Sequence, residues 1–133
     1  MAKREVPRPT DAELAILRVL WQEGLATVRQ VRDVLDRTQP TGYTTVLKLL
    51  QIMTEKGLVT RDESRRTHVY QASRSEEQTQ RHLIGDLARR AFGGSASKLA
   101  MQALASHKAT TEELAEVRKL IETLEQEQKG GGT

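Results

Sequence analysis

Residues 43–51 carry polar side chains at a spacing suited to contact with nucleic acid. An apolar stripe at helical spacing predicts a two-faced helix here, and its members are Val46, Leu49, Leu50 and Met53. The opposite face offers hydroxyl, amide and ammonium groups, which can reach base edges and phosphates without being buried. The candidate DNA-contacting residues on this helix are Tyr43, Thr44, Thr45, Lys48 and Gln51. Taken alone, the segment is also compatible with an ordinary surface helix.

Two adjacent arginines, Arg65 and Arg66, form a second candidate contact with DNA. They fall in a charged segment between two predicted strands, residues 58–61 and 67–72, which are rich in β-branched residues. Guanidinium groups at the tip of such a hairpin can lie along a phosphate backbone. A solvated hairpin tip without a partner is the alternative.

Residues for catalysis or metal binding are not grouped in this sequence. Nucleotide-binding loops, nucleophile elbows and zinc-protease motifs do not occur, and cysteine is absent. His68, His82 and His107 fall on a predicted strand, a helix and a turn, so solvated or satisfied histidines are favoured over a zinc site that also uses neighbouring carboxylates. We therefore predict a protein that is not an enzyme and has no cofactor and no metal.

Three helices and a hairpin are predicted to position the polar face. Capping-box patterns at residues 10–13 and 27–30 begin helices that run to about Glu23 and Asp36, and residues 37–42 form a turn before the helix that ends at Gly57. Trp21 is expected to pack the first helix on its neighbours. A helix-turn-helix followed by a hairpin predicts a winged helix, which we assign to residues 1–74.

The second half predicts amphipathic helices that pair with a second copy of the chain. Further capping boxes at residues 75–78 and 110–113 begin two of them. The fold class is thus mainly α with a small β-hairpin: a winged helix-turn-helix domain, a helical dimerisation domain at residues 75–126, and a disordered tail at 127–133. The predicted dimerisation residues are Leu83, Leu87, Phe92, Leu114, Val117, Ile121 and Leu124.

Composition and charge agree with a small oligomeric protein. The chain has 133 residues, 37% of them hydrophobic and only 3% aromatic, which argues against an RNA-binding sheet that stacks bases on rings. The basic excess lies in residues 1–74, which hold thirteen Lys and Arg against nine Asp and Glu. The sequence shows no signal peptide and no membrane-spanning run, so we predict a cytoplasmic protein that does not insert into membranes.

Several short motifs together resemble the penicillinase-repressor family of bacterial transcriptional regulators. They are residues 9–14 with Trp21, residues 43–46, residues 56–59, residues 67–70 and residues 92–95, and the resemblance extends from about Pro9 to Leu124. It implies a homodimer with N-terminal winged helices and a C-terminal helical dimerisation domain, which represses transcription by binding an operator.

The resemblance also implies a route for release. In several members a membrane-embedded sensor protease leads to cleavage in the dimerisation domain, commonly at an Asn-Phe bond. The corresponding bond here is Ala91–Phe92, where Ala91 stands in place of the asparagine. The copper-responsive branch binds metal through Cys-x-Cys pairs, which this chain lacks. Lys48 and Ile52 stand where members often have Thr and Arg, so a different operator sequence is expected.

The predicted function is therefore a homodimeric, sequence-specific transcriptional repressor that binds a palindromic double-stranded DNA operator. The resemblance implies release by proteolysis of the dimerisation domain, and release by a ligand or by a partner are the open alternatives. The alternative from another class is a winged-helix module that docks a protein partner. A third hypothesis is an enzyme subunit whose catalytic chemistry is supplied elsewhere, and the absence of catalytic residues from this sequence disfavours it.

Overall fold

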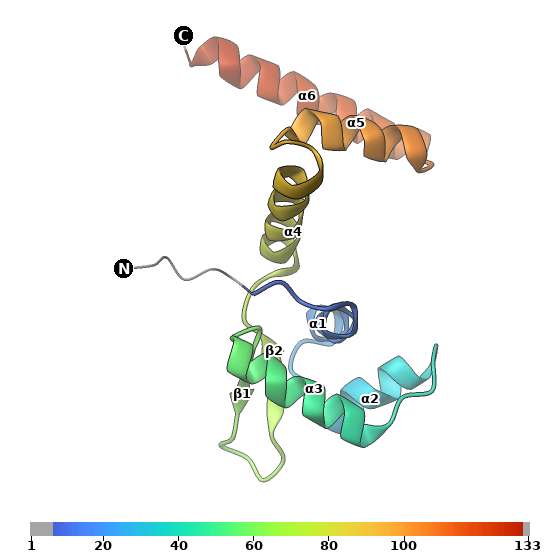
Figure 1. The fold of residues 1–133 in the computed structure, drawn as a ribbon, viewed down its shortest axis with the longest axis vertical. Helices are drawn as coiled ribbons and strands as arrows, with labels where there is room; N and C mark the ends of the chain where they lie inside the picture. Colours follow the sequence, from blue (N-terminus) through green and yellow to red (C-terminus); the bar gives the residue numbers. More distant parts are fainter. Residues whose placement is uncertain (1–6, 132–133) are drawn as a thin grey trace. The chain divides into compact units, whose positions relative to one another are not determined.

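The computed structural model of the protein describes residues 7–131. Within that range the elements follow in the order α1 (Asp11–Glu23), α2 (Val28–Asp36), α3 (Tyr43–Lys56), β1 (Val59–Asp62), β2 (Val69–Ala72), α4 (Glu76–Ala91), α5 (Ala96–Ser106) and α6 (Thr111–Gly130) (Figure 1). This order gives a mainly α chain with one β-hairpin, and α1 to β2 form a winged helix-turn-helix.

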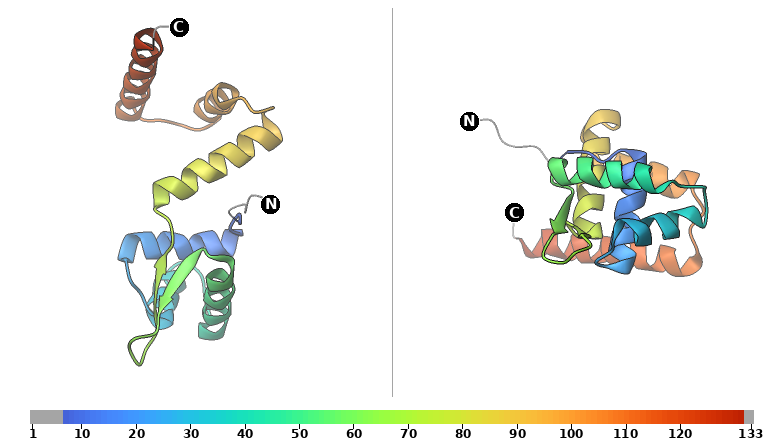
Figure 2. Two further views of the ribbon diagram at one scale, coloured as in Figure 1. Left: turned by 90° about the vertical axis from the view of Figure 1, so that its left-hand side faces the viewer. Right: turned by 90° about the horizontal axis from the view of Figure 1, so that it is seen from below.

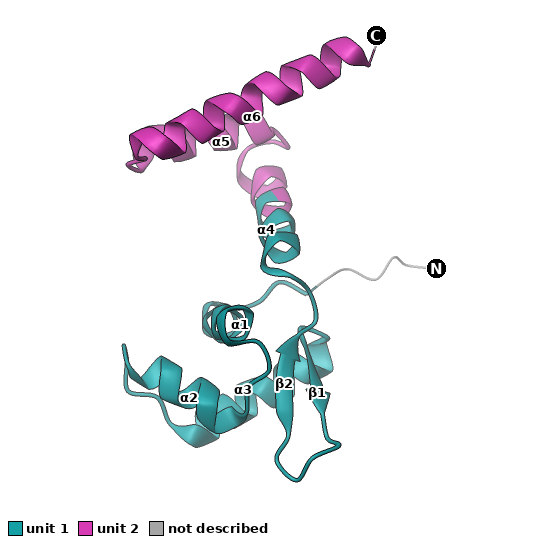
Figure 3. Ribbon diagram, turned by 180° about the vertical axis from the view of Figure 1, so that it is seen from behind, with its two compact units in different colours: residues 1–84 teal, residues 85–133 magenta. Residues whose placement is uncertain are grey.

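The chain divides into two compact units, Met1–Ile84 and Gly85–Thr133 (Figure 3). The division falls inside α4, whereas the sequence places the domain boundary between residues 74 and 75, directly before that helix. The domain limits drawn from the sequence remain a prediction.

Reciprocal capping bonds define the starts of four helices, as the sequence predicts. At α1 the Thr10 amide donates to Glu13 Oε1 at 2.9 Å, and the Glu13 amide donates to Thr10 Oγ1 at 3.2 Å. The same pair of bonds forms before α2, α4 and α6. At the C-terminal end of α3, Gly57 adopts the left-handed conformation with φ of 81°, which glycine accepts without strain.

The hairpin pairs β1 with β2 in antiparallel register, from Val59 opposite Ala72 to Asp62 opposite Val69. The second strand is shorter than predicted, so Thr67 and His68 belong to the loop that joins the strands. That loop projects beyond α2 and α3 in both views that show it from the side (Figure 1, Figure 2).

A single residue between α1 and α2 adds to the sheet. Ala26 pairs with Tyr70, because the Tyr70 amide donates to the Ala26 carbonyl at 2.8 Å and the Ala26 amide donates to the Tyr70 carbonyl at 3.1 Å. The link between α1 and α2 therefore ties the start of α2 to the wing.

One apolar core fills the first unit. Each of the elements from α1 to β2 contributes to it, and its most deeply buried members are Ile16, Leu20, Val31, Val46, Leu50, Met53, Val59 and Tyr70. Trp21 packs against this core, as expected, and its Nε1 donates to the Arg74 carbonyl at 2.9 Å. The indole thereby holds the segment that follows β2 against α1.

A partly buried ion pair joins the first turn of α1 to the last turn of α3. The Glu13 side chain is only 2% exposed, and its carboxylate oxygens accept from Lys56 Nζ at 2.9 and 3.0 Å. Burial by itself raises the pKa of Glu13, but Lys56 and the Thr10 amide outweigh it and leave the pKa below its usual value. Glu13 is thus a charged tertiary contact as well as a capping residue.

Helix α4 continues through Gly85, since one glycine costs a helix only about 1 kcal/mol and does not end it. The second unit departs from the sequence-based expectations at its C-terminal end. Helix α6 continues to Gly130, although residues 127–130 are part of the predicted disordered tail. Glutamate, glutamine and lysine in that stretch are good helix formers, and no helix breaker precedes Gly130. Residues 132–133 of the predicted tail lie outside the described residues.

Candidate nucleic-acid interface

Helix α3 presents the candidate DNA-contacting residues to solvent. Val46, Leu50 and Met53 are buried in the core, which fixes the rotation of the helix about its axis. The opposite face then remains exposed, and the exposed residues on it are Tyr43, Thr44, Thr45, Lys48 and Gln51. The two-faced helix predicted from the sequence is therefore present.

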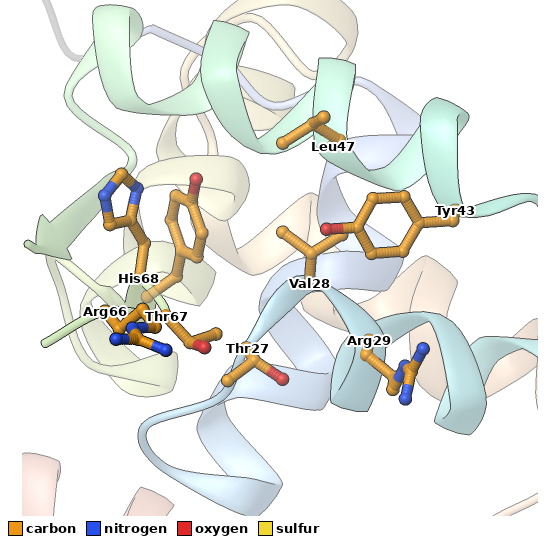
Figure 4. A pocket seen from close by; sticks show the side chains of 9 residues that line it. Thr27, Val28, Arg29, Tyr43, Leu47, Arg66, Thr67 and His68 are labelled. Carbon is orange, nitrogen blue, oxygen red and sulfur yellow. The ribbon is translucent and has the colours of Figure 1, made fainter.

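A groove lies between α2, α3 and the wing, and we call it the interface groove. Figure 4 shows its side chains surrounding a hollow, with the Tyr43 hydroxyl directed toward it from α3. Its lining residues are Thr27, Val28, Arg29, Tyr43, Leu47, Arg66, Thr67, His68 and Tyr70. Of the sequence-predicted residues, the groove brings together Tyr43 and Arg66. It does not include Thr44, Thr45, Lys48, Gln51 or Arg65.

Hydrogen bonds at the wing distinguish its basic residues. Arg61 pairs with the Glu63 carboxylate at 2.7 Å, and this bond, with a second that Arg61 donates to the Tyr70 side chain, raises the pKa of Arg61 above its usual value. Hydrogen bonds from Ser64 and the charge of Arg65 hold the pKa of Asp62 below its usual value, although burial opposes them. Arg61 is thus engaged within the protein, and Arg65 has an acidic neighbour.

Other cations near the groove have no such partner. Among residues 7–131, neither Arg29, Lys48 nor Arg66 forms an ion pair or a hydrogen bond through its side chain. Arg32, one turn along α2 from Arg29, instead pairs with Asp33 at 3.1 Å and donates to the Thr41 carbonyl at 3.0 Å. The unpaired side chains remain available to an external anion.

Sequence reasoning missed four polar residues of the groove: Thr27, Arg29, Thr67 and His68. From the sequence, Thr27 is predicted to cap a helix, and His68 is predicted to be a solvated or satisfied histidine on a strand. The available signal was the capping box at residues 27–30, which places Arg29 in the first turn of a helix. The Ala26–Tyr70 pairing that brings this turn beside the wing has no local sequence signature.

The predicted dimerisation residues lie on helices with little buried surface, except Phe92, which directly follows α4. Within residues 76–131, Ala88 is the one buried residue. Leu83, Phe92 and Val117 are half-buried, and Leu87, Leu114, Ile121 and Leu124 are exposed. Ala91 is the last residue of α4 and is exposed, so the Ala91–Phe92 bond lies at the end of that helix.

Residues 7–131 lack two other kinds of feature. Residues 7–131 hold no group of three or more His, Asp or Glu side chains placed to bind a metal ion. No helix in this range combines the length and the apolar character that crossing a bilayer requires.

Comparison with known proteins identifies the family. The model of the penicillinase repressor family matches residues 9–123. The penicillinase repressor of Bacillus licheniformis is 21% identical over 119 residues, which cover 90% of this chain and 93% of that protein. Among solved structures, the DNA-binding domain of the repressor BlaI gives a TM-score of 0.49 at 24% identity, covering 56% of this chain and 90% of that one.

A variant of ZitR from Lactococcus lactis gives a TM-score of 0.39 at 17% identity, covering 96% of this chain and 80% of that one. The family assignment rests on the family model, which spans nearly the whole described chain. The chain belongs to the penicillinase repressor family.

Proposed function

We propose that this protein is a homodimeric transcriptional repressor that binds a palindromic DNA operator. In each half-site α3 enters the major groove, where Thr44, Thr45 and Lys48 approach base edges and Tyr43 and Gln51 assist. Arg65 and Arg66 of the wing contact backbone phosphates. The observation that carries the proposal is the division of α3 into a face buried in the core and an exposed face that carries Tyr43, Thr44, Thr45, Lys48 and Gln51.

Exposed apolar side chains in the second unit support the homodimer. Leu114, Ile121 and Leu124 are each close to half-exposed and recur with Val117 at alternating spacings of three and four residues. Such spacing produces a continuous seam along one side of a helix, which a second helix of the same kind can cover. Two copies related by a two-fold axis would present two α3 helices to the two halves of a palindrome.

The base-reading role of α3 predicts a loss of sequence-specific affinity on substitution. Lys48→Ala or Thr44→Ala should each weaken operator binding by about 1–3 kcal/mol, because a lost contact to a base edge is not replaced by water at the same geometry. Both side chains are exposed, so the fold should persist. Gel-shift titration with operator and with scrambled DNA of equal length measures the effect.

Lys98→Ala is a suitable control, because Lys98 is an exposed cation of α5 in the other unit. The affinity of the Lys98→Ala variant for the operator should match that of the unmodified protein. Unchanged affinity in Lys48→Ala and Thr44→Ala would exclude base reading by these residues. If the unmodified protein bound no discrete site in the DNA upstream of its own gene, a module that docks a protein partner would become the better interpretation.

Relief of repression by proteolysis in the second unit completes the proposal, with a membrane sensor protease as the upstream partner. The Ala91–Phe92 bond is the candidate site, and the exposure of Ala91 at the end of α4 supports it. Mass spectrometry of the protein from cells exposed to a β-lactam should detect fragments 1–91 and 92–133. Intact protein in cells that have lost repression would exclude release by this cleavage.

A further inference from the structure

We infer that the interface groove is a phosphate-binding site that holds one or two consecutive backbone phosphates of the operator between Arg29 of α2 and Arg66 of the wing. The inference rests on the proposed function and extends it to residues that the exposed face of α3 does not contain. It makes Arg29 a DNA-contacting residue.

The chemistry of the groove suits a phosphodiester. Its nine lining residues include two arginines, a histidine and the hydroxyls of Thr27, Thr67 and Tyr43, and none of them is acidic. Apolar atoms form part of the lining, since Val28 is buried and Leu47 is half-buried. Charge attraction beside a low-dielectric surface is stronger than in open water, so cations here attract an anion more strongly than cations on a fully solvated surface.

The two arginines come from elements that are tied together. Arg29 lies in the first turn of α2, whose start is held by the reciprocal bonds of Thr27 and Gln30 at 2.8 and 3.2 Å. The paired amides and carbonyls of Ala26 and Tyr70 join that start to β2. The start of α2, which carries Arg29, is therefore positioned beside β2 before DNA arrives, and this reduces the ordering that binding requires.

The state of the side chains distinguishes the groove from its surroundings. Arg29 and Arg66 have no intramolecular ion pair within the described part of the chain, whereas Arg32 and Arg61 each pair with a carboxylate at 3.1 Å or less. In the view of Figure 4 the two unpaired arginines lie on either side of Thr27. Binding an anion between them would not require an existing ion pair to break.

The position of Tyr43 favours the DNA backbone over a free anion as the occupant. Tyr43 is the first residue of α3, is 51% exposed, and belongs both to the groove and to the polar face. DNA that lies along that face would continue over Tyr43 into the groove. Because the grooves of DNA are bordered by phosphates, the group that arrives there would be a phosphodiester.

Neutralising phosphates one at a time tests this inference. A set of operator duplexes, each with a single methylphosphonate, is titrated with the unmodified protein and with Arg29→Ala and Arg66→Ala. We expect one or two consecutive positions at which neutralisation weakens binding by the unmodified protein about 5- to 30-fold, but has little further effect on either variant. On unmodified operator, each variant should also show a shallower salt dependence: the negative slope of the logarithm of the association constant against the logarithm of salt concentration should shrink in magnitude by about one unit.

Two matched controls sharpen the result. Arg65→Ala removes the adjacent wing arginine, which does not line the groove, so this variant should stay sensitive to neutralisation at the same positions. Arg18→Ala removes an exposed arginine of α1 and should leave both affinity and salt slope unchanged. Thermal unfolding of each variant verifies that an exposed substitution has left the fold intact.

The possible outcomes are distinct. If Arg29→Ala and Arg66→Ala lose sensitivity to neutralisation at separated phosphates, or at no phosphate, the shared site is refuted. The proposed repressor function would still stand. Saturable binding of inorganic phosphate to DNA-free protein at micromolar concentration, lost in both variants, would assign the groove to a free anion instead. Failure of the unmodified protein to bind any operator would contradict the proposed function itself.

Discussion

Replacing Ile121 with aspartate is expected to convert the protein from a dimer to a monomer and to weaken operator binding by about 10²- to 10⁴-fold. Ile121 is 50% exposed in the single chain and lies at the centre of the proposed seam of α6. Two-fold symmetry repeats every substitution, so each dimer would have to bury two carboxylates without partners, at several kcal/mol each. Loss of the dimer also removes the gain from binding two half-sites at once.

Sedimentation analysis measures the change in mass, and gel-shift titration with the palindrome and with a half-site measures the change in affinity. Val117→Asp should behave in the same way, since Val117 follows the same spacing. Lys119→Asp introduces the same carboxylate on the opposite side of α6 and should remain a dimer. A dimer that survives both seam substitutions would refute this interface.

Removing the charge of Glu13 is expected to destabilise the first unit by about 1–3 kcal/mol at neutral pH. Glu13→Gln preserves the capping bond, because Gln30 makes the equivalent bond at the start of α2 through its amide oxygen at 2.8 Å. The substitution removes only the ion pair with Lys56. The Lys56 side chain is 34% exposed, so its ammonium group can recover part of its hydration when the pair is lost. Urea denaturation followed by the fluorescence of Trp21, the single tryptophan, reports on this unit.

The same pair predicts a dependence of stability on pH. Because the pKa of Glu13 is lower in the folded state than its ordinary value of 4.5, its contribution is complete above that value and is lost as the pH falls through the folded-state pKa. The free energy of unfolding should therefore decrease below about pH 4.5. That decrease in the free energy of unfolding should be smaller in Glu13→Gln. Equal pH profiles in the variant and the unmodified protein would show that the Glu13–Lys56 ion pair does not cause the decrease.

Lys56→Met provides the complementary variant. It leaves a buried carboxylate without its ammonium partner and should cost about 3 kcal/mol, more than Glu13→Gln. The double variant removes both charges and should recover part of that loss. Additive effects would show that the two side chains do not stabilise each other.

Local sequence signals determined much of the fold. The capping boxes set the starts of α1, α2, α4 and α6, and Gly57 set the end of α3, because these signals satisfy backbone groups within a few residues of one another. The periodicity of apolar residues likewise predicted which face of α3 would be buried. The end of α6 was predicted less well, because a polar sequence rich in glutamate and glutamine supports a helix as readily as a disordered tail.

Tertiary structure decided which distant residues meet. The pairing of Glu13 with Lys56, of Trp21 with the Arg74 carbonyl and of Ala26 with Tyr70 joins positions more than forty residues apart, and no local pattern encodes such contacts. The interface groove depends on the last of these, since it brings Arg29 beside the wing. The sequence alone thus determined the polar face of α3, which follows from helical spacing. Only the Ala26–Tyr70 pairing, which brings the start of α2 beside the hairpin, determined which arginines share a groove.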